Sequence, residues 1–183
     1  MVIGVTGGSG SGKTIFCDVA RLMGVYVINA DEVAHEVLEN EAATELMRIF
    51  GTNQRALLRE IVFSSSEKLK LLNEITHKYI LKTIEKMVKM CDNTVIAIEA
   101  ILLIESGAYN MCDEIVAVIA DKEQRIKRAS MRDGYDATAR IEAQAANEFY
   151  KQNSDIIIEN NGTLGELREC AAKYWGNIIE NTD

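Results

Sequence analysis

A glycine-rich segment close to the N-terminus constrains the fold of this chain more than any other feature. Residues 7–14 read Gly-Gly-Ser-Gly-Ser-Gly-Lys-Thr and fit the pattern G-x-x-x-x-G-K-[ST]. A short apolar run at residues 2–6 precedes the segment, and a helix through about residue 23 is expected after it, which is the context that the pattern requires. Glycines let the backbone wrap closely around phosphate oxygens, while successive N–H groups point at the anion. The sequence therefore predicts a phosphate-binding loop.

The side chains of this loop suit a nucleoside triphosphate. Lys13 can reach the β- and γ-phosphates, and the hydroxyl of Thr14 can ligate Mg²⁺. The expected nucleotide contacts are Gly8, Ser9, Gly10, Ser11, Gly12, Lys13 and Thr14. A dinucleotide-binding fingerprint fits these glycines only in a shifted frame, so we rank a dinucleotide site far below a triphosphate-binding loop.

Apolar runs alternate with helical patterns along the rest of the chain. After residues 2–6, such runs occupy residues 25–28, 94–98, 115–119 and 155–158. This alternation predicts a parallel sheet covered by helices on both faces. We expect one α/β domain over residues 1–183, a P-loop NTPase three-layer sandwich with a five-stranded parallel sheet. Two long helical stretches interrupt the alternation of strands and helices. Residues 31–90 are interpreted as an acceptor-binding insertion, and residues 122–150 as a lid and the helix that follows.

Composition narrows the class of protein further. The net charge of −8 argues against a general nucleic-acid surface, and no apolar run approaches the ~20 residues of a membrane span. The four cysteines are too far apart to form a C-x-x-C pair. We therefore expect a cytoplasmic protein with a small-molecule substrate, without nucleic-acid or membrane partners, that is a monomer or a weak homo-oligomer.

Over nearly its whole length the chain resembles the dephospho-coenzyme A kinase family. The segments that carry the resemblance are residues 3–14, 29–35, 55–63, 77–80, 99–105, 124–132, 140–144 and 155–162. Most of these motifs are weak alone, but their order and spacing together are specific. The resemblance implies Mg²⁺-assisted transfer of the γ-phosphoryl group of ATP to the ribose 3′-hydroxyl of dephospho-CoA, the last step of coenzyme A synthesis.

A carboxylate and three cations form the catalytic set that this resemblance implies. Asp31 follows the second expected strand, where a carboxylate can accept the proton of an attacking hydroxyl. The alternative interpretation is that Asp31 caps the helix that follows. Lys13, Arg132 and Arg140 would stabilise charge on the transferring group and would contact the phosphates.

Arginines gather in the expected lid although the chain as a whole is acidic. Arg125, Arg128 and Arg132 stand at i, i+3 and i+7, so one helix face can carry all three. A lid of this kind could close over the triphosphate, whereas the alternative is an ordinary solvated charged helix.

The remaining candidates concern the metal, the adenine and the acceptor. Glu99 follows the third expected strand and could organise Mg²⁺ with Thr14, although a structural hydrogen bond is an equal alternative. The resemblance implies that Gln144 and Asn160 border the adenine. It also implies acceptor contacts at Asp31, Arg55, His77 and Leu102.

Two positions depart from the family pattern. Asn29 stands where the family usually has Asp, and His35 where it usually has Arg. A neutral imidazole cannot replace a bidentate guanidinium. These departures keep open the alternative of a catalytically weakened nucleotide-binding homologue. Another small-molecule P-loop kinase of the shikimate or nucleotide type is a further alternative, because such enzymes also place carboxylates after the second strand. A GTP-dependent switch would need an N-K-x-D segment, which the sequence lacks.

Overall fold

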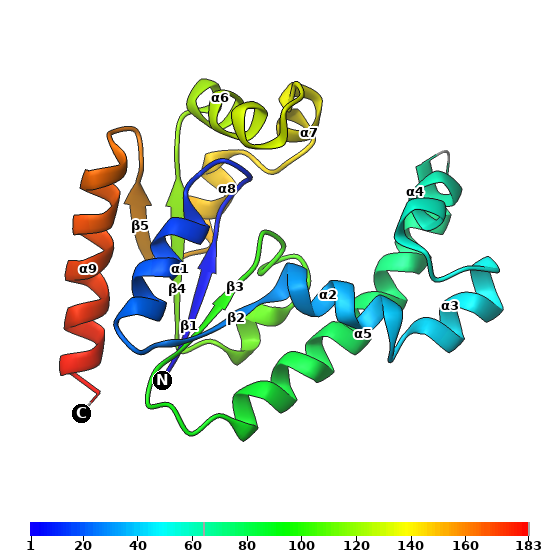
Figure 1. Cartoon of the computed structure of the whole chain (residues 1–183), viewed down its shortest axis with the longest axis horizontal. Helices are drawn as coiled ribbons and strands as arrows, with labels where there is room; N and C mark the ends of the chain where they lie inside the picture. The colour runs from blue at the N-terminus through cyan, green and yellow to red at the C-terminus, as the bar shows by residue number, and fades with distance from the viewer. Residues whose placement is uncertain (64, 183) are drawn as a thin grey trace. The chain divides into compact units, whose positions relative to one another are not determined.

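A computed structural model describes residues 1–63 and 65–182 (Figure 1). The chain forms two compact units. The first, here called the sheet unit, comprises Met1–Ile28 and Asp92–Asp183, and the second, the helical unit, comprises Asn29–Cys91.

Five short strands form one sheet. They are β1 (Val2–Thr6), β2 (Tyr26–Asn29), β3 (Ile96–Glu99), β4 (Glu114–Ile119) and β5 (Ile156–Glu159), in the order β2-β3-β1-β4-β5. β1 lies between β3 and β4 and is parallel to both, with Val5 opposite Glu99 and Thr6 opposite Ala117. The predicted five-stranded parallel sheet is therefore confirmed. Because β1 is central, the loop that follows it lies at the middle of the carboxyl edge.

Both faces of the sheet are covered, as the continuous apolar runs predict. Successive side chains of a strand point to opposite faces. Along β4, Val116 and Val118 belong to a core cluster that also holds Phe16 of α1 (Lys13–Leu22) and Trp175 of α9 (Leu164–Glu180). Ala117, between them in sequence, packs in another cluster that contains Tyr150 of α8 (Asn147–Gln152). The helices α1 and α9 thus cover one face, and α8 covers the other.

Three further short elements complete the sheet unit. A 3₁₀ turn, η1 (Ala108–Met111), follows β3, and α6 (Lys122–Asp133) and α7 (Thr138–Glu142) follow β4. In Figure 1 the helices α6 and α7 lie above the loop that joins β1 to α1. These helices fall within the stretch predicted to be a lid. No helix in residues 1–63 and 65–182 is long and apolar enough to cross a membrane.

The helical unit contains α2 (Ala30–Glu39), α3 (Ala43–Phe50), α4 (Arg55–Phe63) and α5 (Ser66–Met90). Apolar residues at helical spacing produce this unit, because they give each helix one buried stripe. Its buried side chains include those of Val33, Val37, Leu46, Leu58, Ile75 and Ile84. The hydroxyl of Ser65 caps the longest helix, α5, by accepting a hydrogen bond from the backbone of Lys68.

Candidate active site

The glycine-rich loop joins the carboxyl end of β1 to the first turn of α1. Gly12 caps this helix with φ of 107°, a backbone conformation that glycine adopts without steric cost. A side chain at this position would also collide with Asn160, since its Cβ would lie 2.4 Å from Asn160 Nδ2. That same amide donates a hydrogen bond of 2.8 Å to the carbonyl of Ser11. Asn160, which directly follows β5, therefore fixes the second half of the loop.

Lys13 lies inside the loop rather than in solvent. Its side chain is 7% exposed, and Nζ donates a hydrogen bond of 3.3 Å to the carbonyl of Gly8. An ammonium group buried among loop carbonyls is strongly favourable for an incoming phosphate, because little water screens its charge. This position suits phosphate binding by Lys13, which stays a prediction.

Thr14 and Glu99 are brought together at the same edge. Thr14 Oγ1 donates a hydrogen bond of 2.7 Å to Glu99 Oε1, and Glu99 is only 5% exposed. Within residues 1–63 and 65–182, the second carboxylate oxygen, Oε2, is buried and accepts no hydrogen bond. Such an atom calls for a ligand, since an uncompensated buried carboxylate is costly.

These two side chains offer the ligands that Mg²⁺ prefers. Mg²⁺ is usually held by one or two carboxylates or hydroxyls, together with water and substrate phosphates. The described residues contain no cluster of three or more His, Cys, Asp or Glu side chains suited to a metal. A single carboxylate beside a hydroxyl fits a cation that the nucleotide itself helps to hold, and it does not fit an all-protein metal cage.

Two arginines of the predicted lid bind the same aspartate, which was not among the residues expected from the sequence. Arg132 Nε donates a hydrogen bond of 2.8 Å to Asp133, and Arg140 Nη2 binds the other oxygen of the same carboxylate. The hydrogen bond from Arg132 is the main cause that holds the pKa of Asp133 below its usual value. Arg132 also reaches the loop, because its Nη2 lies 3.4 Å from Ser9 Oγ. The two predicted phosphate-binding arginines thus share one counter-ion.

The other two arginines of α6 have different surroundings. Arg128 donates hydrogen bonds to the carbonyls of Asn160 (2.8 Å) and Gly162 (3.2 Å), so it binds the segment after β5. Arg125 is buried against the loop. The alternative of an ordinary solvated charged helix therefore does not describe α6, because Arg125, Arg128 and Arg132 each contact the loop or the segment after β5.

In the helical unit, Asn29 and not Asp31 caps the helix that follows β2. The helix α2 begins at Ala30, and Asn29 Oδ1 accepts hydrogen bonds from the backbone N–H groups of Asp31 and Glu32. The capping alternative considered for Asp31 is thus wrong. Asp31 occupies the first turn with an exposed side chain, which leaves its carboxylate accessible to a substrate. Asn29, which departs from the family pattern, has a structural role.

The candidates for acceptor binding lie on separate elements. Arg55 is the first residue of α4, and together with His35 it lines a cavity of about 140 Å³ within the helical unit. His77 lies in the middle of α5, where burial lowers its pKa. Leu102, in the sheet unit, is 47% exposed on the turns that follow β3. Their contacts with an acceptor remain predictions.

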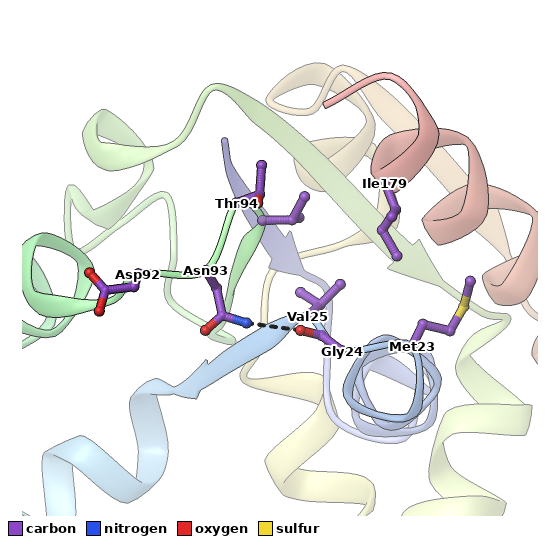
Figure 2. Close-up of a pocket in the computed structure, with 8 residues that line it drawn as sticks. Met23, Gly24, Val25, Asp92, Asn93, Thr94 and Ile179 are labelled. Carbon is purple, nitrogen blue, oxygen red and sulfur yellow. Dashed lines mark hydrogen bonds between the residues drawn. The ribbon is translucent and has the colours of Figure 1, made fainter. Parts of the chain in front are cut away.

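A larger cavity of about 340 Å³ lies at the opposite edge of the sheet (Figure 2). It is bounded by the end of α1, by the segment that precedes β3 and by Ile179 of α9. Asn93 Nδ2 donates a hydrogen bond of 2.9 Å to the carbonyl of Gly24 across it. Parallel sheets bind ligands outside the carboxyl ends of their strands, whereas this cavity lies at the amino ends. The loop edge is therefore the better candidate for the active site.

The fold and the loop edge together define a P-loop nucleotide-binding phosphotransferase. A sequence model of the family described as dephospho-CoA kinase matches residues 1–166. The chain belongs to the dephospho-CoA kinase family. A dephospho-CoA kinase of Dehalococcoides mccartyi is 35% identical over 184 aligned positions, which cover 92% of this chain and 93% of the relative. The kinases of this family use ATP as the phosphoryl donor.

Solved structures agree with this assignment. The dephospho-CoA kinase from Campylobacter jejuni superimposes with a TM-score of 0.78 at 29% identity, covering 100% of this chain and 98% of that protein. A shikimate kinase from Acinetobacter baumannii, in complex with shikimate, gives a TM-score of 0.59 at 15% identity, covering 98% of this chain and 93% of that kinase. The second likeness extends to the fold alone. It does not favour the alternative of a shikimate-type enzyme.

Proposed function

We propose that this protein transfers the γ-phosphoryl group of ATP to the ribose 3′-hydroxyl of dephospho-CoA. Membership of the dephospho-CoA kinase family over residues 1–166 is the observation that carries the proposal. The donor side of the reaction is supported by the loop, in which Lys13 is already buried beside the carbonyl of Gly8.

On the donor side, the loop backbone and Lys13 bind the β- and γ-phosphates. Arg132 and Arg140 stabilise the charge that spreads over the transferring group. Asn160 borders the adenine and holds the loop through Ser11. Thr14 and Glu99 would hold Mg²⁺, which would neutralise part of the negative charge of the phosphates.

On the acceptor side, Asp31 accepts or orients the proton of the attacking hydroxyl. Its place directly after β2 and its exposed carboxylate support this role. Arg55, His77 and Leu102 contact the acceptor. Residues 31–90 bind the acceptor as an insertion in one kinase domain, and residues 122–150 form the lid. The protein is a cytoplasmic monomer or weak homo-oligomer without nucleic-acid or membrane partners.

Acceptor specificity tests the proposal. Purified protein with ATP and Mg²⁺ is given dephospho-CoA, shikimate, AMP or adenosine, and ADP release is followed in a coupled assay. We expect rapid ADP release with dephospho-CoA and only background rates with the other acceptors. Turnover of shikimate or of a nucleoside or nucleotide, with none of dephospho-CoA, would refute the proposed acceptor.

A further inference from the structure

Arg125 is the least exposed cation of the described residues, yet it has no acidic partner there. Its side chain lies on α6 and is 4% exposed. No carboxylate of residues 1–63 or 65–182 lies within 4 Å of its guanidinium nitrogens. Burial lowers its pKa, but an arginine keeps its proton at neutral pH. A positive charge is therefore buried without a counter-ion, which is costly unless another molecule supplies one.

The contacts of Arg125 point to the first half of the phosphate loop. Nε donates a hydrogen bond of 3.1 Å to the carbonyl of Ser9. Nη2 donates one of 2.6 Å to Gln144 Oε1, which also accepts the backbone N–H of Ser9 at 2.9 Å. Both polar groups of the Ser9 backbone are thereby bound, one directly by Arg125 and the other through Gln144.

The glycines of the loop allow this approach. A Cβ on Gly8 would lie 1.9 Å from Arg125 Nη2, so any side chain there would displace the guanidinium. Gly10 also packs closely, since its Cβ would lie 2.4 Å from the backbone oxygen of Arg125. The sequence of the loop thus accommodates an arginine from α6 as well as a phosphate ligand.

We propose that Arg125, acting with Gln144, is a positioning residue for ATP: the pair holds the loop at Ser9, and the phosphates of ATP supply the missing counter-charge of the guanidinium. This inference rests on the proposed nucleotide site but not on the identity of the acceptor. A charge with little water around it is weakly screened, so its attraction for an anion in the neighbouring loop is strong. Asn160 binds the second half of the loop at Ser11, and Arg125 and Gln144 bind the backbone of the first half at Ser9.

A substitution of Gln144 separates the charge from the geometry. Gln144→Glu keeps the shape of the side chain and both hydrogen bonds accepted by Oε1, but it gives Arg125 a carboxylate partner. We expect the variant to melt no lower than the wild type without nucleotide and to bind ATP about 10- to 100-fold more weakly. Gln124→Glu adds the same charge beside Arg125 on α6 and serves as the control, with a much smaller effect.

A substitution of Arg125 tests the same proposal from the other side. In Arg125→Gln we expect a similar loss of ATP affinity, a smaller loss of ADP affinity and the smallest loss of AMP affinity. ADP and AMP have fewer phosphates to interact with the positive charge of Arg125, so they depend on it less. Lys127→Gln, an exposed position on the same helix, removes one charge and should change none of these affinities. If Arg125→Gln does not fold, Gln144→Glu carries the test alone.

Calorimetric titration of the full chain with ATP, ADP and AMP gives these affinities without any acceptor. Unchanged ATP affinity in Gln144→Glu would overturn the inference. So would an equal loss of ATP and AMP affinity in a folded Arg125→Gln variant, because that result describes a merely structural residue. The variants could lose affinity for ATP, ADP and AMP in the predicted order while the wild-type protein does not phosphorylate dephospho-CoA. That result would refute the proposed function and leave this inference standing.

Discussion

Thr14 Oγ1 donates a 2.7 Å hydrogen bond to Glu99 Oε1, and the other oxygen of that carboxylate is buried without a hydrogen-bond partner in the part of the chain that the structure describes. The second residue of α1 and the last residue of β3 thus present two oxygen ligands at one edge of the sheet. This arrangement is the basis for placing Mg²⁺ beside the phosphate loop.

Replacing the carboxylate should weaken the binding of this metal ion. In Glu99→Gln, the new amide oxygen can still accept the hydrogen bond of Thr14, but the negative charge is lost. We expect the Mg²⁺ concentration for half-maximal activity to rise about 10- to 100-fold. A magnesium titration of the kinase assay measures this, with Glu169→Gln on the exposed face of α9 as the control. An unchanged titration curve would show that Glu99 only anchors Thr14.

Asp133 should stabilise the lid in a pH-dependent way. Its pKa is lowered by the hydrogen bond from Arg132 and further by that from Arg140. A carboxylate with a lowered folded-state pKa stabilises the protein above its unfolded pKa, and this contribution is lost as the pH falls through the folded value. Asp133→Asn should therefore melt below the wild type at pH 7, and the difference should shrink below about pH 4.

Thermal melting followed by circular dichroism at pH 7 and pH 3 checks this prediction. The control is Asp121→Asn, since Asp121 directly precedes α6 and its exposed side chain caps no backbone N–H group of that helix. A wild-type advantage over Asp133→Asn that persists undiminished at pH 3 would exclude the ion pairs as its cause.

Asp31 should affect the rate and not the binding of ATP. Asp31→Asn keeps the size of the side chain and leaves the backbone hydrogen bonds to Asn29 intact, but it cannot accept a proton. We expect kcat to fall about 10²- to 10⁴-fold, with little change in KM for ATP. Steady-state kinetics measure both constants, and Glu32→Gln, the adjacent exposed residue, is the control. Wild-type kcat in Asp31→Asn would require a different base.

Trp175 should stabilise the helix that carries Lys13 and Thr14. It is fully buried, and Nε1 donates a hydrogen bond of 3.0 Å to the carbonyl of Phe16 on α1. Trp175→Phe removes this bond and leaves space in the core, so we expect a loss of about 1–3 kcal/mol in the free energy of unfolding. Urea denaturation followed by circular dichroism measures the loss, with Tyr109→Phe as an exposed control. A change below about 0.5 kcal/mol would contradict this account.

The sequence predicts the strands well because each is a continuous apolar run. β1 has the predicted bounds, whereas β3 and β5 end one residue later than predicted, at Glu99 and Glu159. Both end residues are polar, so a prediction from apolar runs leaves them out, although their backbone continues the sheet. The phosphate loop is equally easy to predict from the sequence, since its glycines, lysine and threonine have local roles.

The supporting contacts of the site are harder to predict. In the sequence, Arg125 is one of several arginines on a charged helix, and nothing distinguishes it from the others. Only its packing against Gly8 and Ser9 shows that it is buried. Asp133 likewise gains its role from two arginines at different positions of the lid. The burial of Arg125 depends on long-range packing against the loop, and the ion pairs of Asp133 depend on how the chain turns between α6 and α7; a periodic pattern encodes neither. A helix cap is local, and the cap formed by Asn29 could have been identified from its place before α2.

The nature of the product tests the central claim most directly. Protein incubated with ATP, Mg²⁺ and dephospho-CoA should convert the acceptor to coenzyme A, with a new 3′-phosphomonoester signal by phosphorus NMR and one ADP released for each product formed. The Asp31→Asn variant should give the same product far more slowly. Phosphate on another position of the acceptor, or ATP hydrolysis that leaves dephospho-CoA unchanged, would contradict the proposed function.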